Sequence, residues 1–240
     1  MTRRPAIGSI TPSSNRVVER TLAAILPRFP GLDSCIARIT YYGPGIGQPK
    51  DGYDAEPFRH AAWQLSHAQV GVVCWNGTRG AGLGLEADRA LSATLAEAAG
   101  CPATTASLAT ATLLDLLGAG RIAFVTPGDA AYAQGAALGL GRRFVGAKAM
   151  GLTDNHAASA VTPAAIAALV RELAAESKPD AILLWSTNLP GFEVMAPLEA
   201  ELGIPVIDSA AAGVWGCLAA LGIDPAPAAD LGRIFAMAGG

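Results

Sequence analysis

An internal repeat is the feature of this sequence that most constrains its fold. Three stretches of the first half return, in the same order, in the second half of the 240 residues. The paired stretches are "ITPSSN" (10–15) with "VTPGDA" (125–130), "VVCWNGT" (72–78) with "ILLWSTN" (182–188), and "AAGCPATTASLATATLLDLLG" with "ELGIPVIDSAAAGVWGCLAALG". Their offsets all lie near half of the chain length. The repeat therefore predicts two similar halves, residues 1–118 and 119–240, related by a pseudo-twofold axis.

Within each half, apolar strands alternate with helical stretches. "VGVVCW" and "DAILLW" are near-continuous apolar runs of the kind that is buried on both faces of a parallel sheet. This alternation predicts an α/β fold in which each half is a parallel sheet flanked by helices. Ligands of such sheets bind outside the carboxyl ends of the strands. The pseudo-twofold axis would bring both sets of strand ends to one cleft between the halves, so we expect the active site there.

The composition argues against several classes of protein. A net charge of −3 without a basic stripe argues against nucleic-acid binding, and the apolar runs are too short to span a bilayer. The N-terminus has no apolar segment of the length that a signal peptide needs. Four cysteines without a C-x-x-C spacing and three dispersed histidines argue against a zinc site. We expect a cytoplasmic protein without metal or cofactor and without a membrane partner; whether it is a homo-oligomer stays open.

Four turns follow strands and precede helices, and most of their side chains are small hydroxyls or amides. Helix N-termini bind anions because their first amides are unpaired and the helix dipole is positive there. The alternative is that these residues only cap helices. Because such turns recur at equivalent places in both halves, we favour a site for a carboxylate or an enolate. The turns are Pro12–Asn15, Asn76–Arg79, Pro127–Asp129 and Ser186–Asn188.

Several short motifs resemble those of known enzymes. "PSSN" followed by Glu19, "GLTDN" at 151–155 and "STNL" at 186–189 are similar to maleate cis–trans isomerase. The "GT" at Gly77 and Thr78 is similar to the arylmalonate decarboxylase branch. Both branches belong to the aspartate/glutamate racemase superfamily, whose two pseudosymmetric α/β halves fit the repeat. The resemblance runs from Ile7 to about Leu221.

The resemblance implies roles for individual positions. The superfamily usually carries a cysteine at each of two strand tips, and these positions fall on Gly77 and Ser186. Family asparagines that hold a substrate carboxylate match Asn15 and Asn155. The oxyanion-binding turns match Thr78 and Thr187, and Asn76 and Asn188 are further substrate-binding candidates from the same turns.

Other candidates depart from the family pattern. A family tyrosine falls on Gly128, and Tyr132, one helical turn later, is the candidate replacement. Arg79 would pair with a second carboxylate, unless it is a solvated loop arginine. His156 is the candidate base for Ser186, unless it is a surface histidine. We expect Trp75 and Trp185 beside the cleft, the loop Gly43–Asp51 at its edge, and Cys74, Cys101 and Cys217 in structural roles.

The missing thiols bear on the reaction. A thiolate is a nucleophile and a base near neutral pH, whereas a serine hydroxyl needs a neighbouring base. We expect a cofactor-independent enzyme for a small carboxylic or dicarboxylic acid, closest in motif to maleate isomerase. The alternatives are an arylmalonate-type decarboxylase, a serine-dependent hydrolase of a cyclic amide or ester, and a non-catalytic carboxylate-binding protein. Whether Ser186 is an engineered replacement of a cysteine also stays open.

Overall fold

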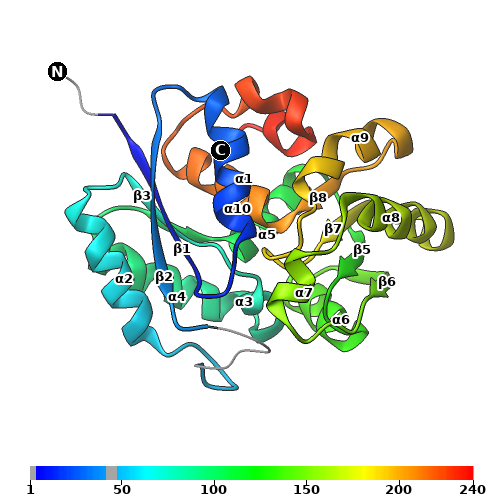
Figure 1. Ribbon diagram of the computed structural model, residues 1–240, viewed down its shortest axis with the longest axis horizontal. Helices are drawn as coiled ribbons and strands as arrows, with labels where there is room; N and C mark the ends of the chain where they lie inside the picture. Colours follow the sequence, from blue (N-terminus) through cyan, green and yellow to red (C-terminus); the bar gives the residue numbers. More distant parts are fainter. Residues whose placement is uncertain (1–3, 42–47, 240) are drawn as a thin grey trace.

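The computed structural model describes residues 4–41 and 48–239 of the chain. It consists of two lobes, each built on one sheet, which lie side by side (Figure 1). The strands of the first sheet lie within residues 6–105 and those of the second within residues 121–208. Among the described residues, no helix combines the length and the apolar character needed to cross a membrane.

The two sheets share one topology. All pairings are parallel, and the strand orders are β2-β1-β3-β4 and β6-β5-β7-β8. The predicted α/β fold with two pseudosymmetric parallel sheets is therefore confirmed. The strands are β1 (Ala6–Pro12), β2 (Asp33–Ile39), β3 (Val72–Trp75), β4 (Ala103–Thr105), β5 (Arg121–Thr126), β6 (Arg143–Ala149), β7 (Ala181–Leu184) and β8 (Val206–Asp208).

Helices follow the strands and flank both sheets. Their starts agree with ordinary capping chemistry: Thr105, Asp129 and Thr162 each accept a hydrogen bond from a backbone amide of the helix that follows. The α-helices are α1 (Val17–Ile25), α2 (Ala55–His67), α3 (Arg79–Leu83), α4 (Leu85–Ala99), α5 (Ala106–Leu116), α6 (Ala130–Gly139), α7 (Asn155–Ser159), α8 (Pro163–Ser177), α9 (Phe192–Leu202) and α10 (Ser209–Ala220). Short 3₁₀ helices are η1 (Leu26–Arg28), η2 (Ala226–Leu231) and η3 (Arg233–Ala236).

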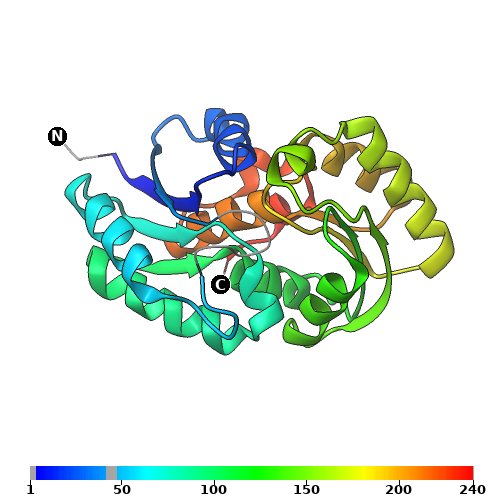
Figure 2. The ribbon, with the colours of Figure 1, turned by 60° about the horizontal axis from the view of Figure 1, so that its bottom comes forward.

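The last long helix joins the two lobes. Although α10 follows the second sheet in the chain, it packs against α5, β3 and β4 of the first. Figures 1 and 2 show α10 in the centre of the molecule, between the lobes. All its residues from Ser209 to Leu218 are buried. A helix from the C-terminal part of the chain therefore covers part of the first sheet.

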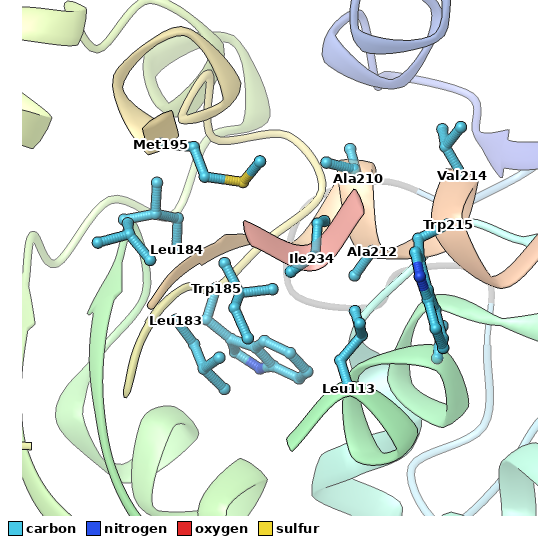
Figure 3. Close-up of a cluster of buried hydrophobic side chains, with 14 of the residues drawn as sticks. Leu113, Leu183, Leu184, Trp185, Met195, Ala210, Ala212, Val214, Trp215 and Ile234 are labelled. Atoms are coloured by element: carbon cyan, nitrogen blue, oxygen red, sulfur yellow. The ribbon is translucent and has the colours of Figure 1, made fainter. Parts of the chain in front are cut away.

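One buried hydrophobic cluster extends through both lobes. Figure 3 shows Trp185 in this cluster together with Leu113 of α5 and Ala212 of α10. Trp185 is 0% exposed, its ring packs edge-on against Phe124, and it is not itself part of the described cavity lining, although its side chain lies beside that of the lining residue Tyr132. The backbone amide of Trp185 donates to the carbonyl of Val125, so the chain is extended here.

Candidate active site

One cavity of about 730 Å³ lies where the strand tips of both lobes meet. Residues from all four predicted turns line it, at the carboxyl ends of β1, β3, β5 and β7. The sequence-based expectation of one cleft lined by both sets of turns therefore agrees with the structure. Cavities of this volume hold small organic ligands.

Asn15 and Thr187 join the two lobes at the cavity floor. Asn15 Nδ2 donates to Thr187 Oγ1 (3.1 Å), which in turn donates to the backbone carbonyl of Asn76 (3.0 Å). Asn15 Oδ1 accepts from the amides of Val17 and Val18 at the start of α1. The Thr187 hydroxyl is thus occupied by the protein, and one Asn15 N–H remains for a ligand.

Asn76 is not part of the cavity wall. Its side chain is buried and its Nδ2 donates to the carbonyl of Ala210 in α10 (3.3 Å). The cavity lining in the described part of the chain does not include it. The expectation that it binds substrate is corrected here, because its amide anchors α10 to the end of β3.

A second set of hydrogen bonds fixes Asn155 and Asn188. Asn155 Nδ2 donates to Ser14 Oγ (2.6 Å), and the backbone carbonyl of Asn155 accepts from Asn188 Nδ2 (2.7 Å). Asn188 Oδ1 accepts from the amide of Arg16 (3.2 Å). Both asparagines line the cavity. Their bonds with Ser14 and Arg16 cross between the lobes, whereas the bond between the two asparagines lies within the second lobe.

Ser186 lies at the tip of β7, half-buried, and lines the cavity. Its φ is 156°, a value that residues with side chains seldom adopt and that is often found at functional sites. Ser186 Oγ accepts from the amide of Asn188 (3.2 Å). Its own hydrogen has no acceptor among the described residues, so the hydroxyl can donate to a ligand.

Gly77 lies at the equivalent tip of β3, over Trp75. A Cβ at position 77 would come within 2.4 Å of the Trp75 ring. Trp75 is 0% exposed and packs edge-on against Tyr41 and Phe58. The expectation that Trp75 lies beside the cleft is met, since it lines the cavity from below. This tip therefore offers backbone and no side chain.

Thr78 and Tyr132 form a hydroxyl pair across the cavity wall. Their oxygens are 2.8 Å apart, and both residues line the cavity. A Cβ at Gly128 would lie 3.2 Å from the Tyr132 ring, so this ring covers the place of the expected family tyrosine. Burial raises the pKa of Tyr132 despite the hydrogen bond to Thr78, which keeps the phenol protonated. Tyr132 is thus a hydrogen-bond donor at neutral pH.

His156 does not lie where the sequence analysis placed it. Asp154 accepts hydrogen bonds from the amides of His156 and Ala157 and starts α7, a short helix that the sequence analysis did not predict. In this helix Asn155 lines the cavity, whereas His156 is exposed and is not part of the described lining. The proposed base for Ser186 is therefore corrected.

Arg79 lines the cavity from the start of α3. Its Nη2 donates to the carbonyls of Pro49 and Lys50, and its guanidinium lies 5.9 Å from the centre of the Tyr53 ring. Gln48, Pro49 and Lys50 also line the cavity, as expected for a loop at the cleft edge. The part of that loop from 43 to 47 lies outside the described residues.

Some lining residues were not singled out in the sequence, among them Tyr41, Gly82, Leu83 and Ala158. Gln48 belongs to the loop expected at the cleft edge but was not itself a candidate for ligand contact, and Tyr41, two residues after the end of β2, belongs to no motif. None of the four cysteines belongs to the described cavity lining, and Cys74 and Cys217 interact with each other in the core. Their expected structural role fits this placement.

The chain is similar to known proteins over most of its length. The profile of the arylmalonate decarboxylase family matches residues 45–235. Arylmalonate decarboxylase from Bordetella bronchiseptica is 30% identical over 243 residues, which cover 96% of each chain. The chain belongs to the arylmalonate decarboxylase family. Its fold and its relatives also fit the aspartate/glutamate racemase superfamily, and its relatives are enzymes of the lyase and isomerase kind.

Solved structures of both branches have this fold. A mutant of arylmalonate decarboxylase with one glycine-to-cysteine and one cysteine-to-serine change is 28% identical, with a TM-score of 0.77 over 91% of this chain and 93% of that chain. A cysteine-to-serine mutant of maleate cis–trans isomerase from Nocardia farcinica, with a covalently bound succinylcysteine intermediate, is 22% identical. Its TM-score is 0.81, over 96% of this chain and 98% of that chain. The short motifs favour maleate isomerase, whereas the match along the whole chain favours the decarboxylase branch.

Proposed function

We propose that this protein is a cofactor-independent decarboxylase of a malonate-type dicarboxylic acid, with Ser186 as the proton donor. Membership of the arylmalonate decarboxylase family supports the reaction type. The observation that carries the proposal is the chemistry of the cavity: its tips offer hydroxyl donors but, among the described residues, no thiol, and the one hydrogen bond of the Ser186 hydroxyl is accepted from the amide of Asn188. Such a site suits a reaction that needs hydrogen-bond donors and a proton, but no strong nucleophile.

In this reaction one C–C bond breaks and one C–H bond forms. The bond between the α-carbon and one carboxylate breaks, carbon dioxide leaves, and the electron pair stays on the remaining acid as an enediolate. One hydroxyl of the Thr78–Tyr132 pair, whose hydrogen is not used within the pair, and the free N–H of Asn15 would donate to its oxygens. Preorganised donors of this kind are worth about 10²–10³-fold each. Ser186 then gives its proton to the α-carbon, and water returns a proton to Ser186.

The serine itself favours decarboxylation over isomerisation. Protonating a strongly basic enediolate requires only an O–H donor, whereas addition to a double bond requires a deprotonated nucleophile. A serine alkoxide is scarce near pH 7 without a base, and His156 is exposed. Because no base is hydrogen-bonded to Ser186 among the described residues, the serine hydrolase is disfavoured as well. A non-catalytic carboxylate-binding protein remains as an outcome of the experiment.

A substrate panel tests the proposal. Purified protein is incubated with phenylmalonate, maleate and a cyclic imide, and the release of carbon dioxide, the formation of fumarate and ring opening are followed in parallel. We expect carbon dioxide release from the malonate alone. Turnover of maleate or of the imide without carbon dioxide release would contradict the proposal. Binding of the acids without any turnover would identify a carboxylate-binding protein instead.

A further inference from the structure

Arg79 has an unusual position for a cation. It lines the cavity and is half-buried, yet it takes part in none of the ion pairs among the described residues. Its Nη1 is buried and makes no hydrogen bond in the described part of the chain, although the guanidinium also interacts with the neutral hydroxyl of Tyr41. Buried charges are ordinarily paired, so a partner is expected when the cavity is filled.

The guanidinium is held in place before any ligand binds. Its Nη2 donates to the carbonyl of Lys50 (3.1 Å) and to that of Pro49. Its other side faces the Tyr53 ring, whose hydroxyl donates to Asp88 (3.2 Å). A solvated loop arginine has no such supports. The planar, preorganised group is suited to a carboxylate.

Gln48 adds a second donor at the same end of the cavity. Its Oε1 accepts from the amide of Asp54 (2.9 Å), which fixes the orientation of the side-chain amide. Its Nε2 is buried and, within the described residues, has no acceptor. Two residues with unpaired N–H donors, and the nearby cation Lys50, thus line this end of the cavity.

We propose that Arg79 and Gln48 form a second anion-binding subsite, which binds a carboxylate on the substituent of the substrate. The inference rests on the proposed function, which places the reacting malonate carbon at Ser186. It adds a substrate class: malonate-type acids whose substituent carries an anionic group, in preference to those with a plain hydrocarbon ring. If Arg79 only fastened residues 49 and 50, its loss would affect both kinds of substrate equally.

The ratio of two substrates separates these roles. We expect wild-type kcat/KM to be at least about tenfold higher for 4-carboxyphenylmalonate than for phenylmalonate, a difference of about 1.4 kcal/mol. Arg79→Met should remove this preference, and Gln48→Leu should reduce it severalfold. Arg143→Met, at an exposed arginine that is not part of the described lining, is the matched control and should leave the ratio unchanged. A wild type without preference, or an equal fall for both substrates in Arg79→Met, would overturn the subsite.

A binding measurement separates this inference from the proposed function. Isothermal calorimetry with benzoate and with benzene-1,4-dicarboxylate needs no turnover. We expect the dicarboxylate to bind at least about tenfold more tightly, and Arg79→Met to remove the difference. If no malonate is decarboxylated but this dependence is found, the subsite stands and the proposed reaction fails. If malonates react but neither measurement depends on Arg79 or Gln48, the subsite fails. Gln48→Leu decides the question if Arg79→Met does not fold.

Discussion

Trp75 and Gly77 show how one residue can restrict its neighbour at the scale of single side chains. The indole fills the space that a side chain at position 77 would need, and it is itself held between Tyr41 and Phe58. Position 77 therefore cannot simply accept the cysteine that the superfamily usually carries there. Of the two equivalent strand ends, only the one at Ser186 therefore carries a side chain that can donate a proton.

This restriction predicts the effect of Gly77→Cys on stability. Overpacking against the fully buried Trp75 should lower the free energy of unfolding by about 1–3 kcal/mol, measured by urea denaturation. Gly135→Ala in α6, where a Cβ meets no atom within 4 Å, is the control and should not destabilise the protein. An equally stable Gly77→Cys variant would show that the ring yields at little cost.

At the scale of elements, the start of α10 contains a buried acid. Asp208 ends β8, is 0% exposed, and accepts a hydrogen bond from the amide of Ala211 (2.9 Å). Burial raises the pKa of Asp208 from 3.8 to about 7, although the amides of Ala211, Ala210 and Gly191 act in the opposite direction. The folded protein therefore holds a proton that the unfolded chain releases within this range.

The buried acid predicts a pH dependence of stability. Because the folded state binds more protons, the free energy of unfolding should fall as the pH rises from about 4 to about 7, by an amount on the order of a few kcal/mol. Asp208→Asn keeps the capping oxygen and should flatten this profile. A weaker pH dependence of the free energy of unfolding should remain in Asp208→Asn, because burial also raises the pKa of Asp88, to about 6. Parallel profiles of wild type and Asp208→Asn would refute this account, and the exposed Asp51→Asn serves as control.

The elements also show what the sequence could and could not predict. Short apolar runs predict the strands, and the internal repeat predicts which strand ends meet. Ser186, Gly77 and Thr78 could therefore be placed at the cavity from the sequence alone. The short helix α7 could not, because it depends on the Asp154 cap rather than on a periodic pattern. In this helix the side chain of His156 is exposed. Contacts between distant segments, such as Asn76 with α10, likewise leave no local signal.

At the scale of the whole molecule, polar side chains hold the two lobes around the cavity. The hydrogen bonds from Asn15 to Thr187 and from Thr187 to Asn76 cross from one lobe to the other. The same contacts that form the cavity floor therefore contribute to the stability of the pair of lobes.

This link predicts the result of Thr187→Val, which keeps the shape of the side chain. It leaves a donor of Asn15 and the carbonyl of Asn76 unpaired, and should destabilise the protein by about 1–3 kcal/mol in urea denaturation. Thr112→Val removes a hydroxyl from the exposed side of α5, where its only recorded contact among the described residues is with Leu108 of the same helix, and should have little effect. A Thr187→Val variant as stable as wild type would mean that the floor contributes nothing to holding the lobes.

The central claim is that Ser186 delivers the proton at the reacting carbon. The most direct measurement is single-turnover decarboxylation by wild type, Ser186→Ala and Ser186→Cys, with the malonate that wild type turns over fastest. Loss of the donor in Ser186→Ala should slow product formation by on the order of 10²-fold or more, whereas the more acidic thiol of Ser186→Cys should retain or raise the rate. A Ser186→Ala protein that forms product as fast as wild type would contradict the account.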